Sequence, residues 1–147
     1  FIFFISLMII DNTDNTDYFL YKYNISKKDQ KRLKIIDDFF KNKINKNLFS
    51  ENSINKIFYY FGNQAVDDIL VFGIIKYKRF DENLIKLRNH FRSKAVPVMP
   101  ISATELMSKY NMQEGKQLGI KLKLIEEKWV ENQFKISDQQ INYIINN

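Results

Sequence analysis

The sequence offers few side chains from which an active site could be built. It contains a single histidine, His90, and no cysteine. A Ser-His-Asp triad, a thiolate nucleophile and a zinc site made of histidine or cysteine therefore lack their parts. Because His90 lies within a basic segment, we expect it at the surface or in packing and not in catalysis.

Two pairs of adjacent aspartates are the other candidates for acid–base or metal chemistry. They are Asp37 with Asp38 and Asp67 with Asp68. Neighbouring side chains on a helix point about 100° apart, so neither pair is expected to share a metal ion. Two-metal nucleotidyl transfer favours Asp-x-Asp on a strand, a pattern that the sequence does not contain. We expect these carboxylates to be solvated or to cap helices.

The glycines provide no phosphate-binding loop. There are four of them, Gly62, Gly73, Gly115 and Gly119, and no two are adjacent. A loop that cradles a triphosphate needs glycines clustered in one short turn. The chain therefore carries no recognisable active site, and we expect it to bind no cofactor by itself.

The positive charge is concentrated in the first two thirds of the chain. The formal net charge is +6, yet residues 96–147 hold six basic and six acidic side chains. Residues 21–46 hold nine lysines and arginines against three acids, and residues 76–94 hold seven against two. Such runs suit a phosphate backbone, because each neutralised phosphate releases a counterion. Lysine-rich helix faces that are merely solvated remain the alternative.

Hydrophobic periodicity and capping signals predict an all-α chain. Residues 27–44, 53–61, 64–78, 82–94, 103–110 and 138–145 read as helices, and no strand hairpin appears. Gly115 is expected to make the turn into a further, longer helix. Leu118, Leu122, Ile125 and Trp129 should form the buried stripe of that helix. Asn63 and Asp81 are expected to cap the helices that follow them, and Gly62 is expected to end a helix. Capping-box spacing is found for Ser26 with Asp29, Ser102 with Glu105 and Ser137 with Gln140. We expect about seven or eight short helices, with the one after Asn63 most deeply buried.

Two prolines divide this helical pattern into two lobes. Pro97 and Pro100 lie three residues apart in an otherwise apolar segment, where they exclude a regular helix. We therefore expect a helical body subdomain over residues 1–95 and a C-terminal helical tail subdomain over residues 96–147.

The N-terminal stretch FIFFISLMII is apolar but short. Its ten residues are about half the length of a membrane span, and no basic flank precedes them as in a signal peptide. We expect the end of a truncated core helix, with a targeting remnant as the alternative. No membrane partner is expected, and the absence of cysteine suits a cytoplasmic protein.

The consecutive aromatic residues of FYYF are a further possible RNA contact. Exposed rings among basic groups can stack on single-stranded bases. The four residues at 58–61 must wrap around a helix, however, and we expect at least two of them to be core.

Several motifs follow one another in a definite order over about residues 18–147. They are an Ile-Ser-x6-Leu helix entry, the run IFYYFGNQAVDDILVFGIIKYK at residues 57–78, a Pro-x-x-Pro segment, a Glu-Leu-Met helix, and Gly-x-x-x-Gly followed by Leu-x-x-x-Glu-x-x-Trp. Outside that run, the residues concerned are Ile25, Ser26, Leu33, Pro97, Pro100, Glu105, Leu106, Met107, Gly115, Gly119, Leu122, Glu126 and Trp129. This order resembles the C-terminal half of bacterial CCA-adding tRNA nucleotidyltransferases and poly(A) polymerases.

This resemblance implies a helical body and tail that hold tRNA. The family's catalytic head, a β-containing domain that binds Mg²⁺, CTP and ATP, has no counterpart in the sequence. The chain is therefore expected to act as a tRNA-binding fragment and to be inactive alone, with a separate head polypeptide as a candidate partner. A poly(A) polymerase fragment, a free-standing RNA-binding or adaptor module, and a purely structural remnant remain alternatives.

Basic residues on exposed helix faces are the predicted phosphate contacts. The first group comprises Lys76, Lys78, Arg79, Arg88 and Arg92. The second group, around the start of the glycine-containing helix, comprises Gly115, Lys116, Gly119, Lys121 and Lys123. At Gly119 we expect a close approach, either by the proline-containing segment or by a phosphate at the helix N-terminus.

Overall fold

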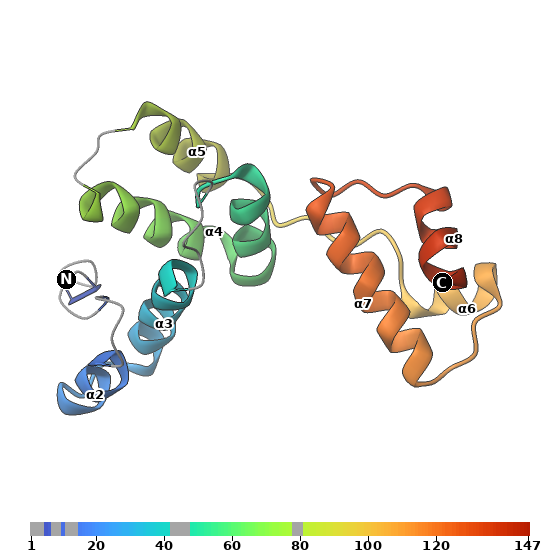
Figure 1. Cartoon of the computed structure of the whole chain (residues 1–147), viewed down its shortest axis with the longest axis horizontal. Coiled ribbons are helices and arrows are strands. Elements are labelled where there is room, and N and C mark those ends of the chain that lie inside the picture. Colours follow the sequence, from blue (N-terminus) through green and yellow to red (C-terminus); the bar gives the residue numbers. More distant parts are fainter. Residues whose placement is uncertain (1–4, 7–9, 11–14, 42–47, 78–80) are drawn as a thin grey trace. The chain divides into compact units, whose positions relative to one another are not determined.

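The protein is helical throughout the part that the structure describes. The structure is a computed structural model that describes residues 5–6, 10, 15–41, 48–77 and 81–147. Seven helices and no strand occur in these ranges, which confirms the predicted all-α class (Figure 1). The chain divides into two compact units, residues 1–95 and 96–147, at the position where the prolines predicted a boundary.

The first unit is built around one long helix. Its helices are α2 (Asn15–Lys22), α3 (Lys27–Lys41), α4 (Glu51–Lys76) and α5 (Glu82–Arg92), and α4 packs against both α3 and α5. The core is formed by apolar side chains from these three helices, which include Leu33, Ile36, Phe40, Phe58, Val66, Ile69, Leu70, Phe72, Leu84 and Phe91. As predicted, the segment after Asn63 is the most deeply buried. Of the N-terminal apolar stretch, Ile5 and Ile10 are buried and most other residues lie outside the described ranges.

A single glycine kinks α4. Gly62 has φ 80° and ψ −177°, a conformation that residues with a Cβ adopt only with strain. The predicted helix break is therefore present with the positive φ that favours glycine, although ψ near 180° lies outside the left-handed helical region. The Asn63 side chain, expected to cap the second half of α4, reaches across to α5 and bonds its carboxyl end.

The capping residues lie where the spacing predicted them. Asp81 accepts a hydrogen bond from the Asn83 backbone N–H and begins α5, while Ser26 accepts one from the Asp29 N–H and begins α3. In the second unit, Ser102 with Glu105 and Ser137 with Gln140 form complete capping boxes. Each box satisfies donors that would otherwise be orphaned in the first turn.

The second unit has its own small core. It comprises α6 (Ala103–Tyr110), α7 (Lys116–Glu131) and α8 (Asp138–Asn146), and α7 packs against both of the others. Leu106, Leu118, Ile125 and Ile141 are buried at the centre. The predicted stripe along α7 is confirmed, because Leu118, Ile125 and Trp129 are buried and Leu122 packs against the cluster.

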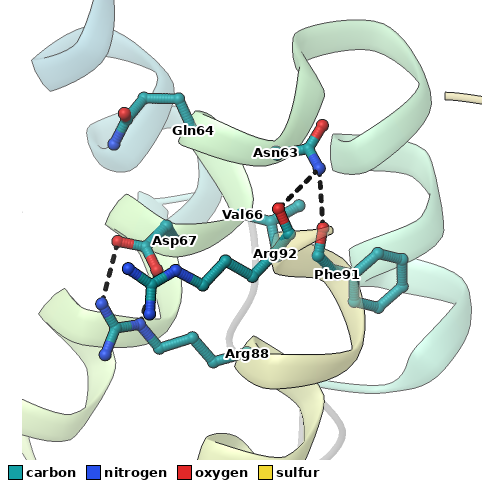
Figure 2. A pocket seen from close by; sticks show the side chains of 7 residues that line it. All are labelled: Asn63, Gln64, Val66, Asp67, Arg88, Phe91 and Arg92. Carbon is teal, nitrogen blue, oxygen red and sulfur yellow. Dashed lines mark hydrogen bonds and ion pairs between the residues drawn. The ribbon is translucent and has the colours of Figure 1, made fainter. Parts of the chain in front are cut away.

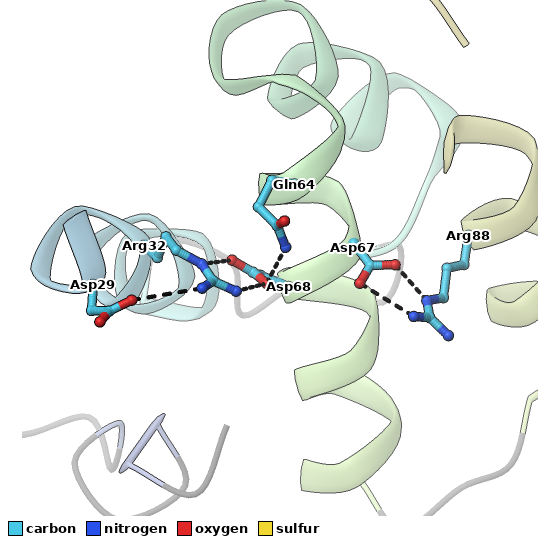
Figure 3. Close-up of polar contacts among 6 residues, drawn as sticks. All are labelled: Asp29, Arg32, Gln64, Asp67, Asp68 and Arg88. Atoms are coloured by element: carbon cyan, nitrogen blue, oxygen red, sulfur yellow. Dashed lines mark hydrogen bonds and ion pairs between the residues drawn. The ribbon is translucent and has the colours of Figure 1, made fainter. Parts of the chain in front are cut away.

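The paired aspartates of α4 hold the first unit together. Asp68 is only 1% exposed and receives two hydrogen bonds of 2.7 Å from Arg32 of α3 and one of 2.9 Å from Gln64. Asp67 accepts from Nε and Nη2 of Arg88 on α5, at 2.5 and 3.2 Å. Figure 3 shows the two carboxylates leaving α4 in opposite directions, each towards its arginine.

The expectation that these carboxylates are solvated or cap helices is therefore wrong for three of the four. Asp37 is also buried and pairs with Lys41 at 2.9 Å, and among the four only Asp38 is exposed. Each of the three carboxylates has a cation as partner, which lowers the cost of removing it from water, although Oδ1 of Asp37 has no hydrogen-bond partner among the described residues.

No helix within the described residues has the length and apolarity that a membrane crossing requires.

Replacing Asp68 should destabilise the first unit strongly. Asp68→Ala leaves the Arg32 guanidinium without its bidentate partner, and we expect a loss of about 3 kcal/mol in the free energy of unfolding. Urea denaturation followed by circular dichroism measures this. Asp17→Ala, at an exposed acid of α2, is the control and should change stability by less than about 0.5 kcal/mol. Equal stability of both variants would contradict a structural role for Asp68.

The second unit should lose stability in acid through Glu105. The pKa of Glu105 lies below its ordinary value, because its carboxylate accepts hydrogen bonds from Ser102. The backbone N–H of Ser102 makes the larger contribution and its hydroxyl the smaller one. A carboxyl whose pKa is lowered by folding stabilises the fold above its ordinary pKa, and that contribution disappears as the pH falls through the folded-state value. Glu105→Gln should therefore flatten the pH dependence of thermal unfolding below about pH 5, whereas Glu114→Gln, at an exposed acid, should not.

Candidate nucleic-acid interface

A cavity between α4 and α5 contains two of the predicted phosphate contacts. It has a volume of about 220 Å³ and is lined by Asn63, Gln64, Val66, Asp67, Arg88, Phe91 and Arg92 (Figure 2). The kink at Gly62 precedes Asn63, whose amide Nδ2 donates to the carbonyl oxygens of Phe91 and Lys94 at 2.7 and 2.9 Å. These bonds satisfy carbonyls at the end of α5 and fix the cavity wall.

The two arginines of this cavity have different environments. Arg88 is held by Asp67, and hydrogen bonding to that carboxylate raises the pKa of the guanidinium above its ordinary value. Arg92 lies one turn further along α5, is exposed, and its guanidinium has no partner among the described residues. Figure 2 shows both side chains extending from α5 towards Asp67. Arg92 is therefore available to an external anion, whereas Arg88 is already engaged.

The remaining members of the first predicted group do not form one cluster with Arg92. Lys76 is half-buried, with Nζ 5.3 Å from the centre of the Phe40 ring and 5.5 Å from that of Phe72. This placement stabilises the ammonium over the core aromatics. Lys78 and Arg79 lie outside the described residues.

The second predicted group lies on or beside α7. Lys116 and Lys123 are exposed and have no partner in the described part of the chain. Lys121 is half-buried, and its Nζ donates at 2.8 Å to the carbonyl oxygen of Ile144 near the end of α8. Lys121 therefore joins two helices, because a cation near a helix C-terminus satisfies an orphaned carbonyl.

The two glycines of α7 have different roles. Gly115 precedes the helix with φ 147°, so it makes the predicted turn. Gly119 is exposed, and a Cβ added there would meet no atom of another residue within 4 Å. The predicted close approach by another part of this chain is therefore wrong at Gly119, since open space surrounds its Cα hydrogens.

A row of lysines on α3 lies within the basic run at residues 21–46, although none of them is among the individually predicted phosphate contacts. Lys27, Lys31 and Lys34 are exposed and have no acidic partner among the described residues. Their spacing of i, i+4 and i+7 puts them on one side of α3, opposite the buried Leu33 and Ile36. The helical periodicity that predicted the apolar face of α3 also contained this signal.

The aromatic run at residues 58–61 contributes less to the core than expected. Phe58 is fully buried, Tyr59 is half-buried, and Tyr60 and Phe61 are 50% and 49% exposed. The prediction of at least two core residues is therefore wrong, because four consecutive residues spread around the helix and among them only Phe58 lies on the buried side.

The described residues contain no group of three or more histidine, cysteine, aspartate or glutamate side chains placed to hold a metal ion. His90 is exposed, and its Nε2 lies 3.3 Å from Nζ of Lys94.

Comparisons of the sequence with protein-family models, with curated proteins and with solved structures found no match.

Filling the open position at Gly119 should stabilise α7. Gly119→Ala adds a methyl group to a helical residue without a clash, and we expect a gain of about 0.5–1 kcal/mol. Guanidinium unfolding monitored by the fluorescence of Trp129, the single tryptophan, reports on this unit. Gly115→Ala is the contrasting variant and should destabilise the unit, because its φ of 147° strains any residue with a Cβ. A loss of stability in Gly119→Ala would show that the surroundings of this glycine are closed.

Proposed function

We propose that this chain binds tRNA through the basic surface of its first unit. In this proposal it acts as the helical body and tail of a CCA-adding tRNA nucleotidyltransferase. Nucleotide addition is assigned to a separate head that supplies Mg²⁺, CTP and ATP, and no residue of this chain is given a catalytic role. Such a protein would work in the cytoplasm.

The observation that carries the proposal is the unpartnered lysine row on α3. With a rise of 1.5 Å per residue, Lys27, Lys31 and Lys34 follow one another at intervals of about 6 and 4.5 Å along the helix axis. Phosphates repeat every few ångströms along a nucleic-acid strand, so a row with this spacing can follow the backbone without reading bases. This suits a protein that must accept many tRNAs by shape.

The contrast between the two units supports the same assignment. The formal surplus of positive charge lies in residues 1–95, whereas residues 96–147 are balanced. Among the described residues of the first unit, Arg32 and Arg88 form internal ion pairs, so the positive charge left at the surface comes from lysines and from Arg92. A duplex is attracted by the surplus that remains at the surface.

Two other functions would use the same surface. A poly(A) polymerase fragment would hold RNA through the same helices, because nucleotide choice resides in the head. A free-standing RNA-binding module would bind structured RNAs in general, with no preference for tRNA. Competition between labelled tRNA and an unrelated RNA hairpin of equal length separates the module from the tRNA-specific body.

A salt titration of tRNA binding tests the proposal. Fluorescence anisotropy with labelled tRNA should show an affinity that falls steeply as the salt concentration rises. Lys31→Gln/Lys34→Gln should weaken binding and lower the slope of log K against log salt by about 1–2, because two phosphate contacts are lost. Glutamine keeps the helix propensity close to that of lysine.

The matched control is Lys128→Gln/Lys135→Gln. It removes the same charge from exposed positions of the second unit and should leave the slope unchanged. Immeasurable affinity of the wild-type chain at low salt would contradict the proposal. So would an equal loss of affinity in the two double variants.

A further inference from the structure

Three tyrosines on α2 and in the turn at its carboxyl end are exposed to solvent. Tyr18, Tyr21 and Tyr23 are 63%, 87% and 57% exposed, while Thr16 and Leu20 on the other side of α2 are buried. Folding leaves these rings outside the core although each could bury a large apolar area. Their exposure therefore needs an explanation in terms of an external partner.

A lysine lies between two of these rings. Nζ of Lys22 is 5.6 Å from the centre of the Tyr18 ring and 5.9 Å from that of Tyr23. The cation–π attraction holds the ammonium at the tyrosine faces without removing its charge. The surface therefore combines flat π systems with a positive charge at close range.

The surroundings of this surface are basic and recessed. A depression of about 580 Å³ is lined by Tyr18, Leu20, Tyr21, Lys22, Asn24 and Gln30, and so joins α2 to the first turn of α3. Lys27 and Lys28 follow at the start of α3, both exposed and without an acidic partner among the described residues. The positive charge of this surface therefore favours a negatively charged binding partner over a neutral one.

We infer that the tyrosine face of α2, formed by Tyr18, Tyr21, Lys22 and Tyr23, is a stacking surface for the unpaired bases of single-stranded RNA. Aromatic side chains interleaved with cations suit this ligand, because every base has a π face and every nucleotide carries one phosphate. Stacking does not depend on which base is bound, so we expect this surface to bind single strands of any sequence.

The inference extends the proposed function and can fail separately from it. The lysine row of α3 would hold the backbone of paired RNA, whereas the tyrosine face needs bases that are free to unstack. A single-stranded end beside a helical stem would engage both surfaces of the first unit.

The test compares binding of a labelled 12-nucleotide oligouridylate with binding of an RNA hairpin, using the full chain and fluorescence anisotropy. Tyr21→Leu should weaken binding of the single strand about tenfold or more, because a stacked ring is lost, and should leave hairpin binding nearly unchanged. Tyr21→Phe keeps the ring and should retain the affinity of the wild type. Tyr143→Leu is the control, because Tyr143 is 70% exposed on α8 of the second unit.

Several outcomes would overturn the inference. Equal binding of the single strand by the wild type and Tyr21→Leu is one, and a similar loss in Tyr143→Leu is another. Tyrosine-dependent binding to vesicles of phosphatidylserine and phosphatidylcholine, without oligouridylate binding, would identify the face as a membrane contact instead. If hairpin binding persists in any of these cases, the stacking inference fails while the proposed function stands.

Discussion

The first unit depends on two adjacent carboxylates that bind arginines of different helices. Because Asp67 and Asp68 are neighbours on α4, they point in different directions, and this divergence lets one helix hold α5 and α3 at once. The geometry that prevents the pair from sharing a metal ion is the geometry that makes it a structural link. Charge-assisted hydrogen bonds thus join α4 to α3 through Asp68 and to α5 through Asp67, beside the apolar core that the three helices share.

These ion pairs also divide the cations of the first unit into two kinds. The guanidinium groups of Arg32 and Arg88 form forked hydrogen bonds with carboxylates, a geometry that an ammonium does not offer. Lys27, Lys31 and Lys34 of α3, by contrast, lie exposed at the surface, where they are hydrated. These ion pairs engage two aspartates of α4 together with the two arginines. The positive surplus that a nucleic acid would meet is therefore richer in lysine than the composition suggests.

Features with local causes could be predicted from the sequence, and features with tertiary causes could not. The capping box of Ser102 and Glu105 lies within four residues, and the α7 stripe ending at Trp129 follows from helical periodicity, so both were found. The partners of Asp68 and Asn63 are 36 and 28 residues away, and no spacing rule connects them. The close approach predicted at Gly119 was wrong for a similar reason. Whether a glycine faces a neighbour or solvent depends on tertiary packing and not on its flanking residues.

The candidate surface has an energetic cost that a polyanion would relieve. Lys27, Lys31 and Lys34 lie within two turns of one helix, so their like charges repel one another in the folded state. In the unfolded chain these lysines can move apart, so their repulsion lowers the free energy of unfolding. A bound phosphate backbone removes that repulsion, and a ligand that binds only the folded state stabilises it by mass action. The same lysines that weaken the free unit would thus couple its stability to RNA, while the Asp68–Arg32 pair keeps α3 in place in either state.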